Sequence, residues 1–386
     1  MTLLAVCPNS SAVLEAAVNA ATRNRSVMLF AATLNQVDFE AGYTGWTQAE
    51  FVREMHSYAE TYQWTGPLYA CLDHGGPWLK DLHTLEKLSY AETMAKVKTS
   101  IAACVQAGYR LLHIDPTVDR TLPSSLALPL ELVVGRTVEL IAYAEQVRIA
   151  NDIPRIDYEV GTEEVHGGMV DFQRFKDFIH LLWTELEKNH LGECWPCLLV
   201  AQIGTDLHTT AFQSDAARQL YTILAPLGSL AKGHYTDWVE TPAAYPITGM
   251  GAANVGPEFT AEEYQVLSEL DKQEKMMTKG ASDSNFLASL QRVVVGSGRW
   301  KKWLQTDELG LDFTQLKPDR QDWLLKTGSR YIWTKPSVVK ARLALYQNLG
   351  KMGIDAHQQV IERITRVIEK YIYAFNLKDS VDALDG

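Results

Sequence analysis

The sequence predicts an α/β fold: a (β/α)8 TIM barrel followed by a helical carboxyl-terminal extension. Eight short apolar runs alternate with segments of helical periodicity, which is typical of a parallel sheet with crossover helices. Nearly every apolar run also ends in a polar residue. In a barrel these strand ends converge on one mouth, whereas in an open sheet they spread along an edge, so the barrel explains both observations.

The apolar runs are the predicted strands. They cover residues 3–7, 27–33, 68–72, 111–114, 155–160, 197–202, 229–233 and 252–255. The last two are short, and the connection between them contains Pro242 and Pro246 instead of a clean helical pattern. A doubly wound open sheet would explain the first six strands equally well.

The segments between these runs have the 3.6-residue periodicity of amphipathic helices. They cover residues 12–22, 48–62, 85–107, 130–151, 172–188, 215–224 and 260–277. Thr47 and Thr260 are each followed three residues later by glutamate, the pattern of a capping box. We therefore expect one helix to begin after each of these threonines.

The pattern changes beyond residue 280, which divides the chain into a barrel domain (1–280) carrying the site and a helical extension (281–386). Helices are expected at 287–295, 303–305, 323–326, 336–349 and 358–373, and no further strand pattern follows. We expect the extension to pack on the barrel and to close over its mouth. The polar end, residues 378–386, is expected to be frayed.

Composition excludes two classes of protein. The 386 residues carry a net charge of −11 with acids and bases interspersed, whereas nucleic-acid binding requires a basic face. No run of about 18 apolar residues could span a membrane, and no secretion signal is visible at the amino terminus. The sequence predicts a cytoplasmic protein.

The candidate site begins with Asp73 and His74, which follow the third apolar run and precede two glycines. This composition suggests a metal-dependent site at the end of a barrel strand. His74 and His234 are the best candidate metal ligands, because zinc prefers imidazoles with one carboxylate and an open position. Glu159 and Glu163 compete for the carboxylate role, and the other acid would serve near the metal or as a general base.

Other polar strand ends have several open interpretations. Gln202 is either a neutral metal ligand or a hydroxyl binder, or it is a structural amide. Asp115 would hold a metal-bound histidine in one tautomer, contact the substrate, or cap the next helix. Asn35, Gln36 and Asn254 offer uncharged hydrogen-bonding groups suited to sugar hydroxyls.

The stretch Gly296-Ser297-Gly298-Arg299 also has two interpretations. Glycines that free backbone amides, next to an arginine, could form a phosphate cradle. Because the stretch follows a predicted helix, it could equally be a helix end stopped by glycine.

Several blocks of the sequence resemble the class II tagatose-bisphosphate aldolase subunits usually called non-catalytic. In order, they are Asn-Gln-Val-Asp with Gly-Tyr-Thr-Gly-Trp-Thr (35–38, 42–47), Asp-His-Gly-Gly-Pro (73–77), His-Ile-Asp (113–115), Gly-Thr-Glu with Gly-Gly (161–163, 167–168), Gly-His-Tyr-Thr-Asp (233–237), Val-Gly-Pro-Glu-Phe-Thr (255–260) and Arg-Tyr-Ile-Trp (330–333). The resemblance covers nearly the whole chain. It extends more distantly to the zinc-dependent class II fructose-bisphosphate aldolases.

This resemblance implies a divalent metal, zinc or alternatively manganese. It implies that His74 is a ligand, that Asp73 carries a proton, that Glu159 lies next to the metal, and that Glu163 is retained as a second catalytic acid. The implied activity is retro-aldol cleavage or carbon-4 epimerisation of a ketose or ketose phosphate of the tagatose or fructose type. The alternative is a non-catalytic subunit that stabilises a separate tagatose-1,6-bisphosphate aldolase. A homo-oligomer is expected in either case.

The sequence also departs from the class II aldolases. The first histidine of their His-x-Asp-His-Gly motif is replaced by Cys71, and the glycine-rich loops that bind phosphate are absent. These departures shift the expected substrate toward ketoses that are held differently or that lack phosphate.

Overall fold

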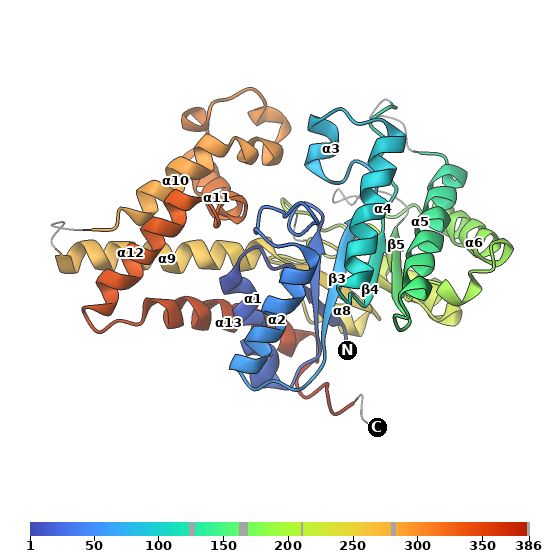
Figure 1. The fold of residues 1–386 in the computed structure, drawn as a ribbon, viewed down its shortest axis with the longest axis horizontal. Coiled ribbons are helices and arrows are strands. Elements are labelled where there is room, and N and C mark those ends of the chain that lie inside the picture. Colours follow the sequence, from blue (N-terminus) through green and yellow to red (C-terminus); the bar gives the residue numbers. More distant parts are fainter. Residues whose placement is uncertain (123–127, 162–168, 210, 279–282, 384–386) are drawn as a thin grey trace.

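A computed structural model describes residues 1–122, 128–161, 169–209, 211–278 and 283–383 (Figure 1). Eight parallel strands close into a barrel in sequence order, so the predicted TIM barrel is confirmed. The strands are β1 (Leu3–Val6), β2 (Met28–Thr33), β3 (Leu68–Gly75), β4 (Leu111–Ile114), β5 (Asp157–Gly161), β6 (Leu198–Val200), β7 (Leu230–Gly233) and β8 (Ala252–Val255). Strand β1 pairs with both β2 and β8, which closes the ring.

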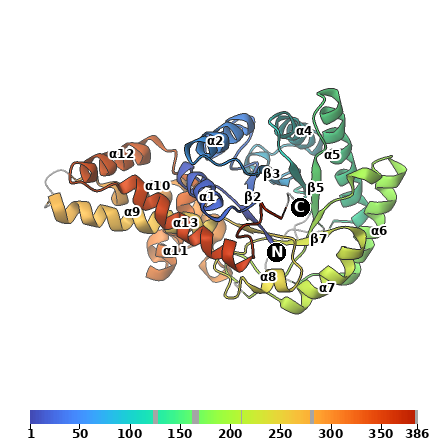
Figure 2. The same cartoon turned by 90° about the horizontal axis from the view of Figure 1, so that it is seen from below.

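Helices surround the barrel (Figure 2). They are α1 (Ser11–Asn24), α2 (Gln48–Thr61), α3 (Asp81–Leu85), α4 (Tyr90–Gln106), α5 (Leu130–Ala150), α6 (Phe172–Lys188), α7 (Ser214–Leu224), α8 (Ala244–Ile247) and α9 (Pro257–Thr278), with 3-10 turns η1 (Gly192–Cys194) and η2 (Ala225–Leu227). The helix predicted at 85–107 is divided into α3 and α4. The reason is that Ser89 and Glu92 form a capping box, which starts α4.

Only one of the two predicted capping boxes exists. Thr47 and Glu50 form the expected reciprocal hydrogen bonds at the start of α2. Thr260, however, is buried inside α9, which begins at Pro257, a residue whose fixed φ suits a first helical turn. That start is capped by Asp237, whose Oδ1 accepts the backbone N–H groups of Gly256 and Glu258 at 3.0 and 2.7 Å.

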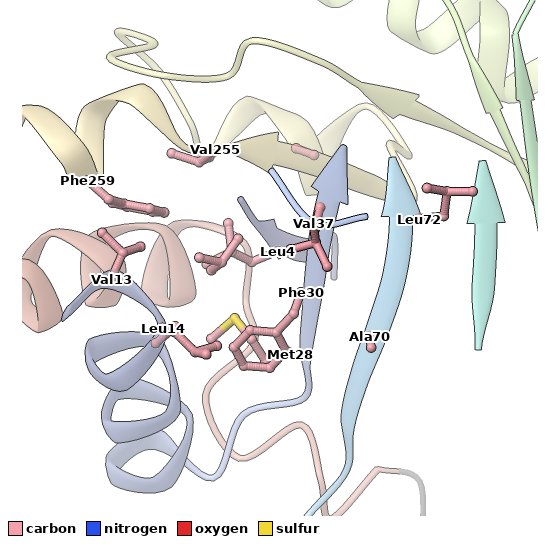
Figure 3. Packing of buried hydrophobic residues seen from close by; sticks show 14 of the residues in the cluster. Leu4, Val13, Leu14, Met28, Phe30, Val37, Ala70, Leu72, Val255 and Phe259 are labelled. Atoms are coloured by element: carbon pink, nitrogen blue, oxygen red, sulfur yellow. The ribbon is translucent and has the colours of Figure 1, made fainter. Parts of the chain in front are cut away.

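The strands alternate between two apolar environments because successive side chains point to opposite faces. Leu4, Phe30 and Leu72 lie in the layer between the barrel and the surrounding helices (Figure 3). Neighbouring positions such as Ala5 and Cys71 belong to a second, smaller buried cluster from the strands. The strands are thus apolar on both faces, and their polar residues are concentrated at the carboxyl ends.

The carboxyl-terminal region is helical, as predicted. It contains α10 (Phe286–Ser297), α11 (Pro318–Gly328), α12 (Pro336–Gly350) and α13 (Ala356–Ala374), with 3-10 turns η3 (Arg299–Trp303), η4 (Thr306–Glu308), η5 (Phe313–Gln315) and η6 (Ser329–Tyr331). Helix α9 projects from the barrel to meet these helices, and α13 returns to pack against α1 and α9 (Figures 1 and 2). The extension therefore packs on the barrel, while the division at residue 280 stays a prediction.

The end of the chain is bound to the end of α1 and to the residues that lead into β2. The backbone N–H of Asp379 donates to the carbonyl oxygen of Asn24, and Ser380 Oγ accepts the N–H of Val27 at 3.0 Å. The expectation of a frayed end is therefore wrong for residues 378–383. The residues after 383 lie outside the described part. Across the described residues, none of the helices has the length and apolar character needed to cross a membrane.

Candidate metal centre and adjoining cavity

A cavity of about 380 Å³ opens at the carboxyl ends of the strands. Its lining comes from two parts of the chain, the strand ends and the carboxyl-terminal extension. The barrel contributes Cys7, Asn9, Thr33, Asn35, Gln36, Tyr43, Asp73, His74, Leu79, Asp81, Leu207, His234, Tyr235, Asp237, Asn254, Gly256 and Pro257, and the extension contributes Arg299, Lys302, Trp303, Arg330 and Tyr331. The extension thus forms part of the wall of this cavity, and its closure over the mouth of the barrel stays a prediction.

The end of β3 is irregular where it delivers Asp73 and His74. Its register against β4 shifts between Leu72 and Gly75, and His74 has a φ of 52°, in the left-handed region. A non-glycine residue in this region is strained, and bulges of this kind redirect side chains beside functional sites. Gly76 is needed next, because a Cβ there would lie 1.7 Å from the carbonyl oxygen of Asp115.

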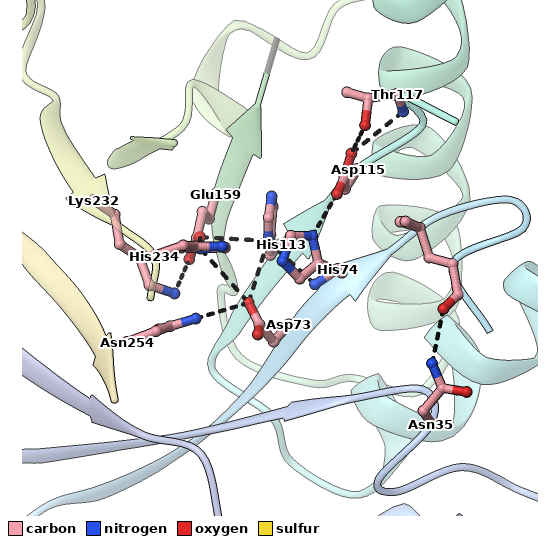
Figure 4. A network of polar contacts seen from close by, with 11 residues as sticks. Asn35, Asp73, His74, His113, Asp115, Thr117, Glu159, Lys232, His234 and Asn254 are labelled. Carbon is pink, nitrogen blue, oxygen red and sulfur yellow. Dashed lines mark hydrogen bonds and ion pairs between the residues drawn. The ribbon is translucent and has the colours of Figure 1, made fainter. Parts of the chain in front are cut away.

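Three imidazoles and one carboxylate meet at the centre of the barrel (Figure 4). The ring centroids of His74 and His113 are 4.7 Å apart, as are those of His74 and His234. With Asp73, these residues offer one ligand atom each, and the four atoms all lie within 4.8 Å of one another. His113 and His234 are nearly completely buried, whereas His74 is partly exposed to the cavity.

Asp115 orients His74 from behind. Its Oδ2 lies 2.5 Å from His74 Nδ1, and its Oδ1 accepts the hydroxyl hydrogen of Thr117. This leaves Nε2 of His74 as the nitrogen available to a ligand. Asp115 does not line the cavity, so its geometry favours the tautomer-holding interpretation over substrate contact.

Glu159 lies beside the three imidazoles and is paired with a lysine. Lys232, on β7, donates to Glu159 Oε2 at 2.6 Å, and both side chains are fully buried. Glu159 Oε1 lies 3.3 Å from His234 Nε2 and 3.4 Å from His113 Nδ1. Glu159 is thus placed next to the cluster, with one oxygen neutralised by lysine and the other facing the imidazoles.

These charges set the protonation of the cluster. Burial opposes ionisation of Asp73, but the imidazoles of His74 and His234 outweigh it and hold the pKa of Asp73 well below its usual range. Burial also opposes the charge on His74, yet Asp73 and Asp115 raise its pKa to about 9. His234, in contrast, has a pKa lowered to about 4, chiefly by burial. At neutral pH Asp73 is therefore an acceptor, and His234 is neutral as metal ligands are.

The polar atoms of the predicted substrate-binding amides are partly engaged by the chain. Asn254 donates to Asp73 Oδ1 at 3.1 Å, while its own Oδ1 is buried without a partner among the described residues. Asn35 bridges the backbone of Leu79 and Asp81. Gln36 donates to Asn9 Oδ1 at 3.1 Å. All three amides line the cavity, so a substrate contact stays a prediction for each.

One further predicted residue is not brought into this centre, and a second cannot be placed. Gln202 follows β6 and accepts the N–H of Val170 through its backbone carbonyl, and it is not among the described residues that line the cavity. Glu163 lies outside the described residues, so its role as a catalytic acid stays a prediction.

The donor set fits a divalent metal. Three imidazoles and a carboxylate, with an adjoining cavity for substrate, form the ligand chemistry that zinc prefers. His113 faces this cluster with Nδ1, which lies 3.4 Å from Asp73 Oδ1, while its Nε2 is buried without a hydrogen-bond partner among the described residues. His74, His113 and His234 could hold the ion, and Asp73 either completes the ligand set or stays free beside it.

Two central residues are not among the site residues expected from the sequence. His113 lies inside a four-residue strand that is otherwise apolar, where a histidine is an unusual buried residue. Lys232 lies inside a short strand that is otherwise apolar, where a lysine signals a buried counter-charge. In both cases the signal was a polar residue inside a strand and not after it.

The glycine stretch before Arg299 is the end of a helix. Gly298 has a φ of 66° and its N–H closes α10, so the phosphate-cradle interpretation of the backbone is not what the structure shows. The arginine that follows nevertheless lines the cavity and contacts Asp81 Oδ2 at 2.5 Å.

The chain resembles known proteins in sequence and in fold. A family model described as D-tagatose-1,6-bisphosphate aldolase subunit GatZ/KbaZ-like matches residues 1–374. The chain belongs to this family. The resemblance expected from the sequence is therefore confirmed for the GatZ/KbaZ-like family.

Individual relatives of this GatZ/KbaZ-like chain agree in fold or in sequence. A D-tagatose 6-phosphate 4-epimerase from Agrobacterium fabrum (strain C58 / ATCC 33970) is 24% identical over 369 residues, covering 90% of this chain and 84% of the relative. The crystal structure of a probable tagatose 6 phosphate kinase from Sinorhizobium meliloti 1021 matches with a TM-score of 0.81 at 21% identity, over 97% of this chain and all of the other. The fructuronate-tagaturonate epimerase of Cohnella laeviribosi has a TM-score of 0.59 at 10% identity, over 97% and 81% of the two chains.

Proposed function

We propose that this chain is a metal-dependent carbon-4 epimerase of a tagatose-type ketose phosphate. The main evidence is the cluster of His74, His113, His234 and Asp73. Their ligand atoms converge beside a cavity large enough for a sugar. The family and the 4-epimerase relative support the choice of substrate and reaction.

Asp73 is the residue that moves the proton. Its Oδ1 is held by Asn254 and lies 3.4 Å from His113 Nδ1, so the carboxylate is fixed at the cavity wall in its ionised form. It would accept the proton of the 4-hydroxyl as the bond between carbons 3 and 4 breaks, and the electron pair of that bond remains on the ketone half. Rotation of the resulting aldehyde and re-formation of the same bond, with return of the proton from Asp73 to oxygen 4, inverts carbon 4.

A divalent ion held by the three histidines, most simply zinc, would supply Lewis-acid stabilisation of the negative charge on the ketone half. The chain's own contribution is to keep the donors in place. Asp115 fixes the ring of His74, and burial keeps His234 neutral. Lys232 holds Glu159 ionised beside them, since burial alone would raise the pKa of Glu159, which instead is lowered to about 2.

The test measures metal content and turnover of the isolated chain. Purified protein should contain about one zinc or manganese per chain and should interconvert tagatose 6-phosphate and fructose 6-phosphate, its carbon-4 epimer. His74→Ala and His234→Ala should each lose the metal and at least 1000-fold of the activity. His180→Ala removes an exposed histidine on α6 and should change neither quantity. A wild-type chain that holds no metal after zinc is added back would contradict the proposal.

The family description supports one second candidate, a subunit that assists a separate aldolase. On that hypothesis the isolated chain would turn over no ketose but would increase the activity or lifetime of a catalytic tagatose-bisphosphate aldolase. Release of triose in place of epimer by the isolated chain would instead indicate a lyase. The same assay therefore separates the three activities.

A further inference from the structure

The cavity wall formed by the extension contains a buried arginine without an acidic partner. Arg330 is only 5% exposed, and no ion pair joins it to a carboxylate within the described residues. Its Nη2 donates to the hydroxyl oxygen of Tyr331 at 2.9 Å, while its Nη1 is buried with no hydrogen-bond partner there. Leaving a donor of a buried cation unsatisfied is costly, which indicates that a ligand completes the site.

The surroundings of Arg330 hold its guanidinium in place without neutralising it. The group lies 4.6 Å from the ring centroid of Trp303 and 4.8 Å from that of Tyr331. Trp303 Nε1 donates to the same Tyr331 hydroxyl oxygen at 2.9 Å, which fixes the phenol. Aromatic faces attract a cation and limit its movement, but they leave its charge available to an anion.

Two further cations lie on the same wall. Arg299 lies 4.4 Å from the ring centroid of Tyr331, and it shares Asp81 with Lys302, whose Nζ is 3.2 Å from Asp81 Oδ1. One carboxylate thus partly neutralises two cations. Asp237 also lines the cavity, but burial raises its pKa to about 7, and its Oδ1 is occupied by two backbone N–H groups.

We propose that Arg330, assisted by Arg299 and Lys302, binds the phosphate group of the substrate. The identity of the sugar rests on the proposed function, whereas the anion site rests on the unpartnered arginine alone. The extension then supplies the anion-binding half of the active site, in place of the glycine-rich loops that the barrel lacks. A phosphate dianion suits three cations better than a carboxylate does, because it offers more charge and three acceptor oxygens.

The binding test uses inorganic phosphate on the intact chain and therefore does not require turnover. Calorimetry should show saturable binding of phosphate to the wild type, and Arg330→Met should weaken it at least tenfold, as expected for losing charge-assisted hydrogen bonds. Arg330→Lys should lie between the two, because lysine keeps the charge but loses the planar fork. Arg292→Met removes an exposed arginine from α10 and is the matched control, which should bind like the wild type.

The kinetic test distinguishes phosphate from other anions and from the free sugar. Arg330→Met should raise the KM for tagatose 6-phosphate about 30-fold and should change the KM for free tagatose far less, because free tagatose has no phosphate for Arg330 to bind. Tagaturonate, which carries a carboxylate in place of the phosphate, should compete at least tenfold more weakly than inorganic phosphate. Equal competition by tagaturonate, or equal losses on both sugars, would overturn the assignment of a phosphate subsite.

Folding and function are separated by two controls. If Arg330→Met does not fold, as judged by circular dichroism, the double variant Arg299→Gln/Lys302→Gln tests the same site from less buried positions and should also weaken phosphate binding at least tenfold. Unchanged phosphate binding in a folded variant overturns the inference even if the chain is an epimerase. Phosphate binding that depends on Arg330 in a chain that turns over no ketose supports the anion site and contradicts only the proposed activity.

Discussion

The barrel side and the extension side of the cavity differ in how their buried charged side chains are paired. On the barrel side the buried charges of the metal centre have opposite partners: Glu159 faces Lys232, and Asp115 faces His74. On the extension side Arg330 donates to the hydroxyl of Tyr331 and lies over the rings of Tyr331 and Trp303, and no ion pair joins it to a carboxylate among the described residues. The charges on the barrel side therefore hold one another in place, whereas the charge of Arg330 on the extension side is left for a ligand.

The largest change in stability is expected when one partner of the buried Lys232–Glu159 ion pair is removed. Lys232→Met leaves Glu159 buried without its cation, and we expect a loss of about 3–5 kcal/mol in the free energy of unfolding, measured with urea. The double variant Lys232→Met/Glu159→Leu removes both charges and should recover most of this stability. A single variant within about 1 kcal/mol of the wild type would show that the pair does not control the stability of the barrel.

The second expected change in stability comes from Glu263 on α9, which contacts Ser10 of the barrel and Arg342 of the extension. This buried acid accepts the hydroxyl hydrogen of Ser10 and lies 3.7 Å from Arg342, but burial dominates and raises its pKa from 4.5 to about 7. Between these values the folded state binds more protons than the unfolded state. Stability should therefore fall as pH rises from about 4.5 to 7, by on the order of 3 kcal/mol.

The matched variant for this acid is Glu263→Gln. It keeps an oxygen for Ser10 but cannot ionise, so the decline between pH 4.5 and 7 should flatten and the variant should be the more stable protein at pH 8. Urea unfolding at pH 5, 6, 7 and 8 measures this, and parallel curves for both proteins would contradict the assignment.

A smaller effect is expected from Asp115, which acts on the metal centre through His74. Asp115→Asn preserves the size of the side chain but removes the carboxylate that, after Asp73, raises the pKa of His74 and that fixes its ring. We expect metal affinity to fall 10- to 100-fold with little change in phosphate binding. A chelator competition measures the first quantity. Loss of phosphate binding in this variant would show that the two halves are not separate.

The smallest change is expected from Arg299 and tests how the two arginines of the extension side rank in phosphate binding. Arg299 already shares Asp81 with Lys302, so Arg299→Gln removes a partly neutralised charge. The KM for tagatose 6-phosphate should rise about fivefold, clearly less than for Arg330→Met, because a cation with a carboxylate partner contributes less to an anion. A larger effect of Arg299→Gln than of Arg330→Met would reverse the proposed order of the two arginines.

Much of the barrel half could be predicted from the sequence. The eight strands were visible as apolar runs, and Asp73, His74 and His234 were visible because each follows such a run directly. Periodicity reports which elements exist, and a polar residue at the end of a strand reports the mouth of the barrel. Thr260 shows the limit of local signals, since a proline and an acid from a distant loop determine the true start of α9.

The extension half could not be predicted in the same way. Arg330 was visible only as part of a motif, because its importance depends on a missing partner, and a missing partner is a property of three-dimensional packing. Lys232 and Glu159 lie 73 positions apart on β7 and β5, and their pairing depends on the register of both strands against β6, which lies between them. The absence of the glycine-rich loops of the class II aldolases shifted the expected substrate toward ketoses held differently or without phosphate, whereas the cations proposed to bind phosphate come from a different part of the chain.

The contact between the two ends of the chain has a consequence for synthesis. The N–H of Thr2 donates to the carbonyl oxygen of Phe375, and α1 packs against α13. Because synthesis adds roughly 5–20 residues per second, α13 leaves the ribosome on the order of 20–75 s after α1. During that interval an apolar face of α1 remains uncovered, so the nascent chain is a natural client for chaperones that shield such surfaces.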